Sequence, residues 1–156
     1  MDGHHQITVY LGGPMTGKTL AEAMEWRDRT TSVLVAHGFR VLSPLRGKTS
    51  SLPMAEPIQA AAHRRASLRD EALLGRDRND IKESDIGLFN LLGADVASIG
   101  TVGEIILAHE FRKFSIVIME KSSIHDHPFI RAAASVVVRT LDEGIECVLE
   151  WAGVSE

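Results

Sequence analysis

The chain has few of the features that mark secreted, membrane-inserted or zinc-binding proteins. Its single cysteine, Cys147, excludes an internal disulfide and leaves a cysteine-based zinc site without ligands. No apolar run approaches the roughly 18 residues that cross a bilayer, and the N-terminal MDGHHQITVY has neither a basic region nor an apolar signal core. We therefore expect a cytoplasmic protein with no membrane partner.

Aromatic residues and excess positive charge are also scarce. Aromatics make up 5% of the chain, and 17 Lys and Arg stand against 21 Asp and Glu, which gives a formal net charge of -4. Most nucleic-acid binding depends on a basic face and on aromatic side chains that stack with bases. The composition therefore predicts no nucleic-acid partner, although local hydrogen-bond donors could bind a small anion.

The chain does have enough apolar sequence for one core. Of its 156 residues, 44% are apolar, and a chain of this length buries roughly 70% of the surface that it exposes when unfolded. We therefore expect a single domain over residues 1–156.

Short apolar runs alternate with helical patterns along the chain. Runs bounded by glycine or proline predict strands, and apolar residues at helical spacing predict helices. The expected order is strand 7–11, helix 19–37, strand 39–42, loop 44–57, helix 58–73, helix 77–84, strand 86–92, helix 102–112, strand 115–119, strand 135–138 and helix 141–151. This alternation predicts an α/β protein with a parallel sheet, and ligands bind such sheets beyond the carboxyl ends of the strands.

A possible phosphate loop follows the first expected strand. Residues Gly12 to Thr19 match G-x4-G-K-[ST], in which backbone N–H groups cradle phosphate, Lys18 reaches the terminal phosphates and Thr19 holds magnesium. However, Pro14 removes one backbone donor, and no later strand ends in an aspartate for the metal. Three alternatives remain: a small P-loop kinase or nucleotide-binding module, a turn without a ligand, and a loop that binds one phosphate or a sugar hydroxyl.

Three segments, 9–17, 76–86 and 98–105, follow expected strands or lead into expected helices. In this order they resemble the nucleoside 2-deoxyribosyltransferase family, which includes transferases and 2'-deoxynucleoside 5'-monophosphate N-glycosidases. The resemblance implies a flavodoxin-like, doubly wound α/β domain with a parallel five-stranded sheet and helices on both faces. It also implies a transferase or hydrolase of nucleotide salvage that cleaves the N-glycosidic bond of a small-molecule deoxynucleoside or its 5'-monophosphate. The sugar would pass through a covalent glutamate intermediate to another base or to water, with no cofactor and no metal.

The resemblance assigns three catalytic residues. Glu104 is expected to be the nucleophile, because a carboxylate stabilises the oxocarbenium-like centre and then closes on it. Asp77 is expected to exchange a proton with the base, and the Tyr10 hydroxyl to orient Glu104. The alternatives are that Glu104 only favours a helix N-terminus, that Asp77 is a helix cap with Asp80 or Asp85 in its place, and that Tyr10 is a core residue.

The substrate-binding residues follow from the same resemblance. Many transferases of the family carry an aspartate six residues before the nucleophile, where this chain has Ser98. A hydroxyl can donate a hydrogen bond to a phosphate that a carboxylate would repel, so Ser98 is expected to form a 5'-phosphate pocket with the first loop, unless it is a plain loop serine. The full expected set is Gly13, Thr16, Gly17, Arg46, Ser98, Gly100 and His127.

The segment 124–131 lies where family members reach into a neighbouring subunit's site. His125 and His127 alone are too few for a metal site, so a donor role across an interface is the expected use. The resemblance therefore implies a homodimer or larger homo-oligomer with shared active sites, in which His127 or Arg131 faces the partner.

Overall fold

The computed structural model describes residues 3–46 and 70–154. They form one parallel sheet of five strands in the order β2-β1-β3-β4-β5. The strands are β1 (Thr8–Gly12), β2 (Arg40–Leu42), β3 (Ile86–Asn90), β4 (Phe114–Ile118) and β5 (Val136–Val138). This order is that of flavodoxin-like folds and confirms the expected doubly wound α/β architecture. No helix in the described ranges is long and apolar enough to span a membrane.

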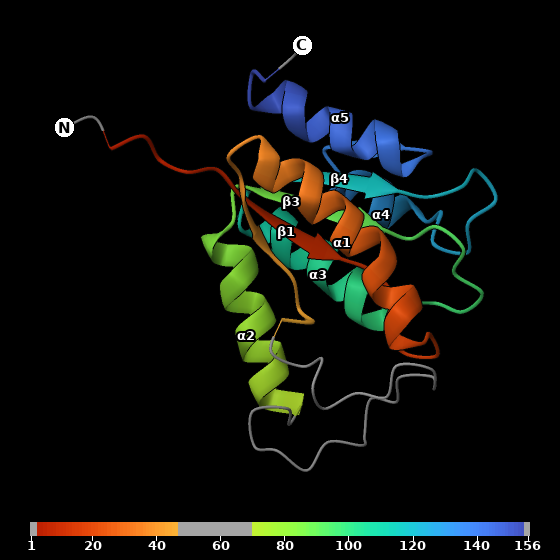
Figure 1. Cartoon of the computed structure of the whole chain (residues 1–156). Helices are drawn as coiled ribbons and strands as arrows, with labels where there is room; N and C mark the ends of the chain where they lie inside the picture. The colour runs from red at the N-terminus through yellow and green to blue at the C-terminus, as the bar shows by residue number, and fades with distance from the viewer. Residues whose placement is uncertain (1–2, 47–69, 155–156) are drawn as a thin grey trace.

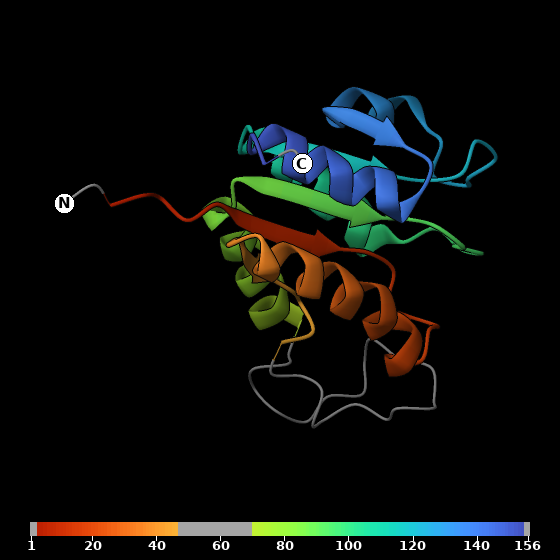
Figure 2. The ribbon, with the colours of Figure 1, turned by 45° about the horizontal axis from the view of Figure 1, so that its top comes forward.

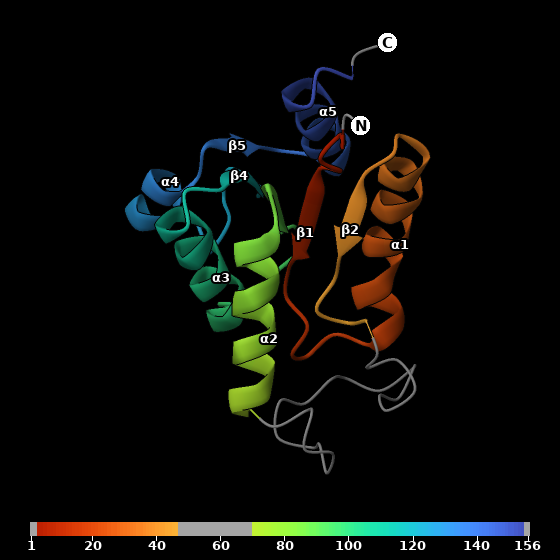
Figure 3. The ribbon, with the colours of Figure 1, turned by 90° about the vertical axis from the view of Figure 1, so that its left-hand side faces the viewer.

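Helices cover both faces of the sheet (Figures 1 and 3). On one face lie α1 (Leu20–Ala36) and α5 (Leu141–Trp151); on the other lie α2 (Asp70–Glu83), α3 (Ile99–Glu110) and α4 (Pro128–Ala133). Successive side chains of a strand point to opposite faces, so each central strand supplies both cores. Val9 and Leu88 pack on the α1 and α5 side, whereas Tyr10 and Phe89 pack on the α2 and α3 side.

The chain reverses its direction of travel across the sheet between β1 and β3. From β1 it moves outward to β2, and from β3 it continues to β4 and β5 on the other side. Figure 2 shows β1 and β3, in red and green, side by side in the middle of the sheet. The loops that follow these two strands therefore lie on either side of the crevice in which such folds bind ligands.

The second helix differs from the expectation. α2 is continuous from Asp70 to Glu83, so Asp77 lies inside the helix, and the alternative of Asp77 as an N-cap is wrong. The helical pattern continues through Gly75 because one isolated glycine weakens a helix by only about 1 kcal/mol. The rest of the expected helix 58–73 and most of the expected loop 44–57 lie outside the described residues.

Two further boundaries change what lies at the edge of the sheet. α3 begins at Ile99, three residues before the expected start, which makes Ser98 its N-cap residue. α4 was not expected from the sequence, because its six residues are too few to show helical periodicity. It begins at Pro128, where a fixed φ and a missing N–H suit the first turn of a helix.

Candidate active site

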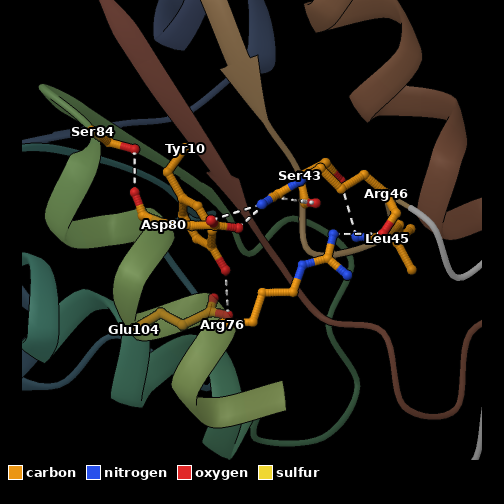
Figure 4. A network of polar contacts seen from close by, with 8 residues as sticks. All are labelled: Tyr10, Ser43, Leu45, Arg46, Arg76, Asp80, Ser84 and Glu104. Carbon is orange, nitrogen blue, oxygen red and sulfur yellow. Dashed lines mark hydrogen bonds and ion pairs between the residues drawn. The ribbon is translucent and has the colours of Figure 1, made fainter. Parts of the chain in front are cut away.

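The three expected catalytic residues come from three elements and meet at the carboxyl edge of the sheet. Tyr10 of β1 donates a 2.7 Å hydrogen bond from its hydroxyl to Oε1 of Glu104 on α3 (Figure 4). Asp77 of α2 and Glu104 both line a cavity of about 430 Å³. The structure thus brings together the proposed nucleophile, the residue expected to orient it and the residue expected to exchange a proton.

The cavity is built from the loop after β1, one residue of α2 and the start of α3. Its volume is within the usual range for small-molecule sites, about 300–1,000 Å³. The other expected residues that line it are Gly13, Thr16, Ser98 and Gly100. Gly17, Arg46 and His127 do not line it.

The buried Tyr10 hydroxyl is held in its protonated form. Burial raises the pKa of Tyr10 well above its ordinary value, and the nearby carboxylates of Glu104 and Asp77 raise it further. A neutral phenol can donate to a carboxylate, whereas a phenolate would repel it. Tyr10 is therefore a permanent donor to Glu104 in the neutral pH range.

Gly12 allows the Glu104 carboxylate to reach this position. A Cβ atom at Gly12 would lie 2.8 Å from Oε2 of Glu104 and 2.6 Å from the Phe89 ring, closer than real Cβ contacts come. Any side chain at residue 12 would displace the carboxylate or the ring. The glycine is required here by close approach of the nucleophile.

The other two aspartates near Asp77 have different roles. Buried Asp80 accepts two hydrogen bonds from the Arg46 guanidinium, with 2.7 Å between Nη2 and Oδ1 (Figure 4), and this contact raises the pKa of Arg46. Asp85 accepts a 2.9 Å hydrogen bond from the backbone N–H of Thr8. Neither aspartate lines the cavity, which favours Asp77 as the acidic residue of the site.

Ser98 lies at the cavity-facing end of α3. Its hydroxyl is 2.8 Å from that of Thr101, and its backbone N–H donates a 2.8 Å hydrogen bond to Nε2 of His125. Its side chain makes no capping bond, and the first turn of α3 contains no acidic residue. The N–H groups of a first helical turn have no partners within the helix, so this end of α3 can offer donors to a ligand.

Two buried polar residues beside the site make contacts that were not expected, and His125, expected as a donor across an interface, is instead an acceptor within the chain. His125 is 3% exposed, and burial lowers its pKa; because Nε2 accepts from Ser98, its proton is on Nδ1. Arg27 is 2% exposed and donates to the carbonyl of Gly13, on the cavity wall. Only Arg27 had a usable signal, since it shares the buried stripe of α1 with Leu20, Ala23, Thr30 and Leu34.

The remaining expected residues have local partners. His127 is the N-cap residue of α4, where its ring accepts a hydrogen bond from the N–H of Phe129, and Arg131 pairs with Asp126. Their role toward a partner subunit stays a prediction. Within residues 3–46 and 70–154, no group of three or more His, Cys, Asp or Glu side chains could hold a metal ion.

The loop from Gly12 to Thr19 ends in a capping box at the start of α1. Thr19 accepts a 3.1 Å hydrogen bond from the N–H of Glu22, and the Glu22 carboxylate accepts a 2.9 Å bond from the N–H of Thr19. Gly17 supplies the turn with a φ of +84°. In a phosphate loop these groups would face phosphate and magnesium, so a carboxylate at the start of α1 disfavours the triphosphate alternative.

The chain's only tyrosine makes the Tyr10 environment directly measurable. We expect no phenolate absorbance from the folded protein near pH 10, where tyrosine ordinarily titrates. Because its folded pKa is raised, Tyr10 contributes stability that is complete below pH about 10 and is lost as the pH rises above it. Glu104→Gln should lower the pH at which phenolate appears, whereas Asp142→Asn, a remote exposed carboxylate, should not. Ordinary titration of the folded protein would contradict this description.

Comparison with known proteins places the chain in a family. Residues 9–143 match the family described as Nucleoside 2-deoxyribosyltransferase. No curated protein sequence matches the chain. The solved CMP N-glycosidase of Clostridium botulinum is similar with a TM-score of 0.56 and 13% identity, over 92% of this chain and 98% of that one. A 2-deoxyribosyltransferase from Leishmania mexicana gives a TM-score of 0.54 and 12% identity, over 74% of this chain and 65% of that one.

A molybdenum cofactor binding protein from Rippkaea orientalis is also similar, with a TM-score of 0.62 and 14% identity over 96% of this chain and 99% of that one. At such identities the structural likeness shows a shared fold, and one fold supports many functions. The family match is the more specific finding, because it extends over most of the chain and includes Tyr10, Asp77 and Glu104. The chain belongs to the nucleoside 2-deoxyribosyltransferase family.

Proposed function

We propose that this protein cleaves the N-glycosidic bond of 2'-deoxynucleosides, with a preference for their 5'-monophosphates, through a covalent deoxyribosyl-Glu104 intermediate. The observation that carries the proposal is the 2.7 Å hydrogen bond from Tyr10 to Glu104, which lines a substrate-sized cavity together with Asp77. The sugar passes from Glu104 to water in a hydrolase or to a second base in a transferase.

The two carboxyl groups divide the chemistry. The Glu104 carboxylate attacks the anomeric carbon, the C–N bond breaks, and its electron pair leaves with the base. Asp77, as the acid, gives the departing base a proton and later takes one from the water or from the accepting base. Tyr10 holds one oxygen of Glu104, so the carboxylate meets the sugar in a fixed orientation.

The start of α3 supports a 5'-phosphate in this reaction. Ser98, Gly100 and Thr101 line the cavity there, and no acidic residue in the first turn opposes an anion. Hydrogen bonds to a charged group contribute roughly 1.5 to 3 kcal/mol each, and a helix N-terminus favours negative charge. Thr16, on the loop after β1, also lines the cavity and adds a hydroxyl.

A second copy of the chain completes the site in this proposal. Apolar side chains are exposed on α3 and α4 and on the loop before α3, with Ile99 85% and Phe129 73% exposed, and Val96 and Ile99 line the cavity. Exposed apolar surface of this kind marks interaction sites. A symmetric partner on this face would cover it and bring His127 or Arg131 of one copy toward the site of the other.

The nucleophile is tested by Glu104→Ala. Incubated with a panel of deoxynucleosides and deoxynucleoside monophosphates, the native protein should release free base, and the variant should lose at least about 1,000-fold in kcat, because the covalent route is gone. Glu110→Ala, which removes an exposed carboxylate from the other end of the same helix, should retain native turnover. Comparable turnover of Glu104→Ala would refute the assignment.

The same panel separates this proposal from the P-loop alternative. Lys18→Ala should retain base release, and EDTA should leave the rate unchanged. ATP hydrolysis that depends on metal and disappears in Lys18→Ala would establish the alternative instead.

The 5'-phosphate is tested by Ser98→Asp. Aspartate is a good N-cap residue, so α3 should be kept, but its charge should repel the phosphate. We expect kcat/KM for the monophosphate to fall at least about tenfold, equivalent to roughly 1.4 kcal/mol, with a smaller loss for the free nucleoside. The control is Ser98→Asn, because asparagine has the shape of aspartate but no charge. Equal losses on both substrates, or a native preference for the nucleoside, would rule out the phosphate pocket.

The assembly is tested by sedimentation and light scattering. We expect a dimer or larger symmetric oligomer, and Phe129→Asp should give monomers with little activity because it places a charge in the apolar contact. Val35→Asp, an equally drastic change at an exposed position on the other face of the sheet, should leave the assembly intact. A native monomer with full activity would contradict the proposal.

A further inference from the structure

A buried guanidinium lies beneath the loop that forms one wall of the cavity. Arg27 of α1 is 2% exposed. Its Nη1 donates to the carbonyl of Ala23 at 2.6 Å, and its Nη2 donates to the carbonyl of Gly13 at 3.0 Å. Its Nε has no hydrogen-bond partner in the part of the chain that the structure describes. The side chain therefore ties α1 to the loop after β1 with only part of its donor capacity.

Arg27 and Glu104 approach the same turn from opposite faces of the sheet. A Cβ atom at Gly12 would lie 2.8 Å from Oε2 of Glu104, and a Cβ atom at the next residue, Gly13, would lie 3.5 Å from Nη2 of Arg27. One charged group comes from α3 and the other from α1. Glu104 thus lies beside residue 12 and Arg27 beside residue 13, on opposite sides of the backbone.

The charge of Arg27 has no direct counter-ion among the described residues, since the ion pairs found there involve other side chains. Burial outweighs the opposite effects of Glu104, Tyr10 and Asp77 and lowers the pKa of Arg27 to about 10, so the guanidinium is charged at neutral pH. The centroid of the Trp26 ring lies 4.6 Å from the guanidinium carbon and the ring stabilises the cation, but a buried charge without an ion-pair partner is still costly. The carboxylates of the site are the opposite charges that offset this cost through space.

We propose that Arg27 is a positioning residue of the reaction proposed above: its charge keeps Glu104 ionised, and its hydrogen bond to Gly13 fixes the loop that walls the cavity. A cation near a carboxylate in a poorly solvated site favours the charged form, which is the form that attacks. A charge on the α1 side of the sheet therefore favours the reactive, ionised form of Glu104 on the α3 side. This inference depends on the proposed function for its meaning in catalysis, but its physical content can be measured without a substrate.

The experiment is a pH titration of the Glu104 side-chain carboxyl carbon by carbon-13 NMR, with Glu104→Gln to assign the signal. Arg27→Met removes the charge and keeps an unbranched stem, and it should raise the titration midpoint of Glu104 by about one pH unit. Arg27→Lys keeps the charge and should stay within about 0.3 units of the native midpoint. Arg29→Met, which removes an exposed arginine from the same helix, should not move it.

An unchanged midpoint in Arg27→Met, or an equal shift in Arg27→Lys, would overturn the charge role and leave Arg27 as a clamp on the loop. If Arg27→Met does not fold, Arg27→Gln, which also removes the charge, takes its place. In an active enzyme, the acid limb of kcat/KM should move with the midpoint in Arg27→Met. If the protein releases no base but the midpoints move as expected, the proposed function is rejected and the role of the Arg27 charge is kept. If the protein releases base but the midpoints do not move, the role of the Arg27 charge is rejected and the proposed function is kept.

Discussion

The hydrogen bond from Tyr10 to Glu104 is the contact on which the site depends, because it joins a central strand to a helix 94 residues later in the chain. It requires the sheet register that places β1 beside β3, where Gly12 pairs with Phe89. It also requires that Gly12 carry no side chain. The tyrosine is buried in the core between the sheet and α2 and α3, so the donor cannot turn away to water. The packing that buries Tyr10 in the core therefore also orients the proposed nucleophile.

The electrostatics of the site involve both layers of helices. Asp77 and Glu104 come from the layer of α2 and α3, and their negative charge opposes ionisation of Tyr10. Arg27 comes from the layer of α1 and provides a nearby buried positive charge. The loop after β1 lies between these charges and also forms a wall of the cavity. A fold shared with a molybdenum cofactor binding protein is thus specialised by a few buried polar side chains rather than by its topology.

The sequence predicts what depends on local pattern. The strands around Val9 and Leu88 are apolar on both faces, which is typical of a buried parallel sheet, and the family resemblance located Tyr10, Asp77 and Glu104. It did not predict that residues 70–83 form one helix, since the pattern divided them between helices 58–73 and 77–84. It did not predict α4, which is held by a cap and by tertiary packing. The roles of Arg27 and His125 arise from contacts with Gly13 and Ser98, 14 and 27 residues away, which no local pattern records.

The central claim, that Glu104 bonds to the anomeric carbon, is tested most directly by the stereochemistry of transfer to methanol. A methyl glycoside does not interconvert between anomers at neutral pH, so its configuration records the path of the sugar. Two successive displacements, first by Glu104 and then by methanol, retain the β configuration of the nucleotide, and proton NMR of the product should show the β-methyl deoxyriboside. The α anomer, or a mixture of both, would contradict the account, because it would mean that the acceptor attacks without a covalent intermediate on Glu104.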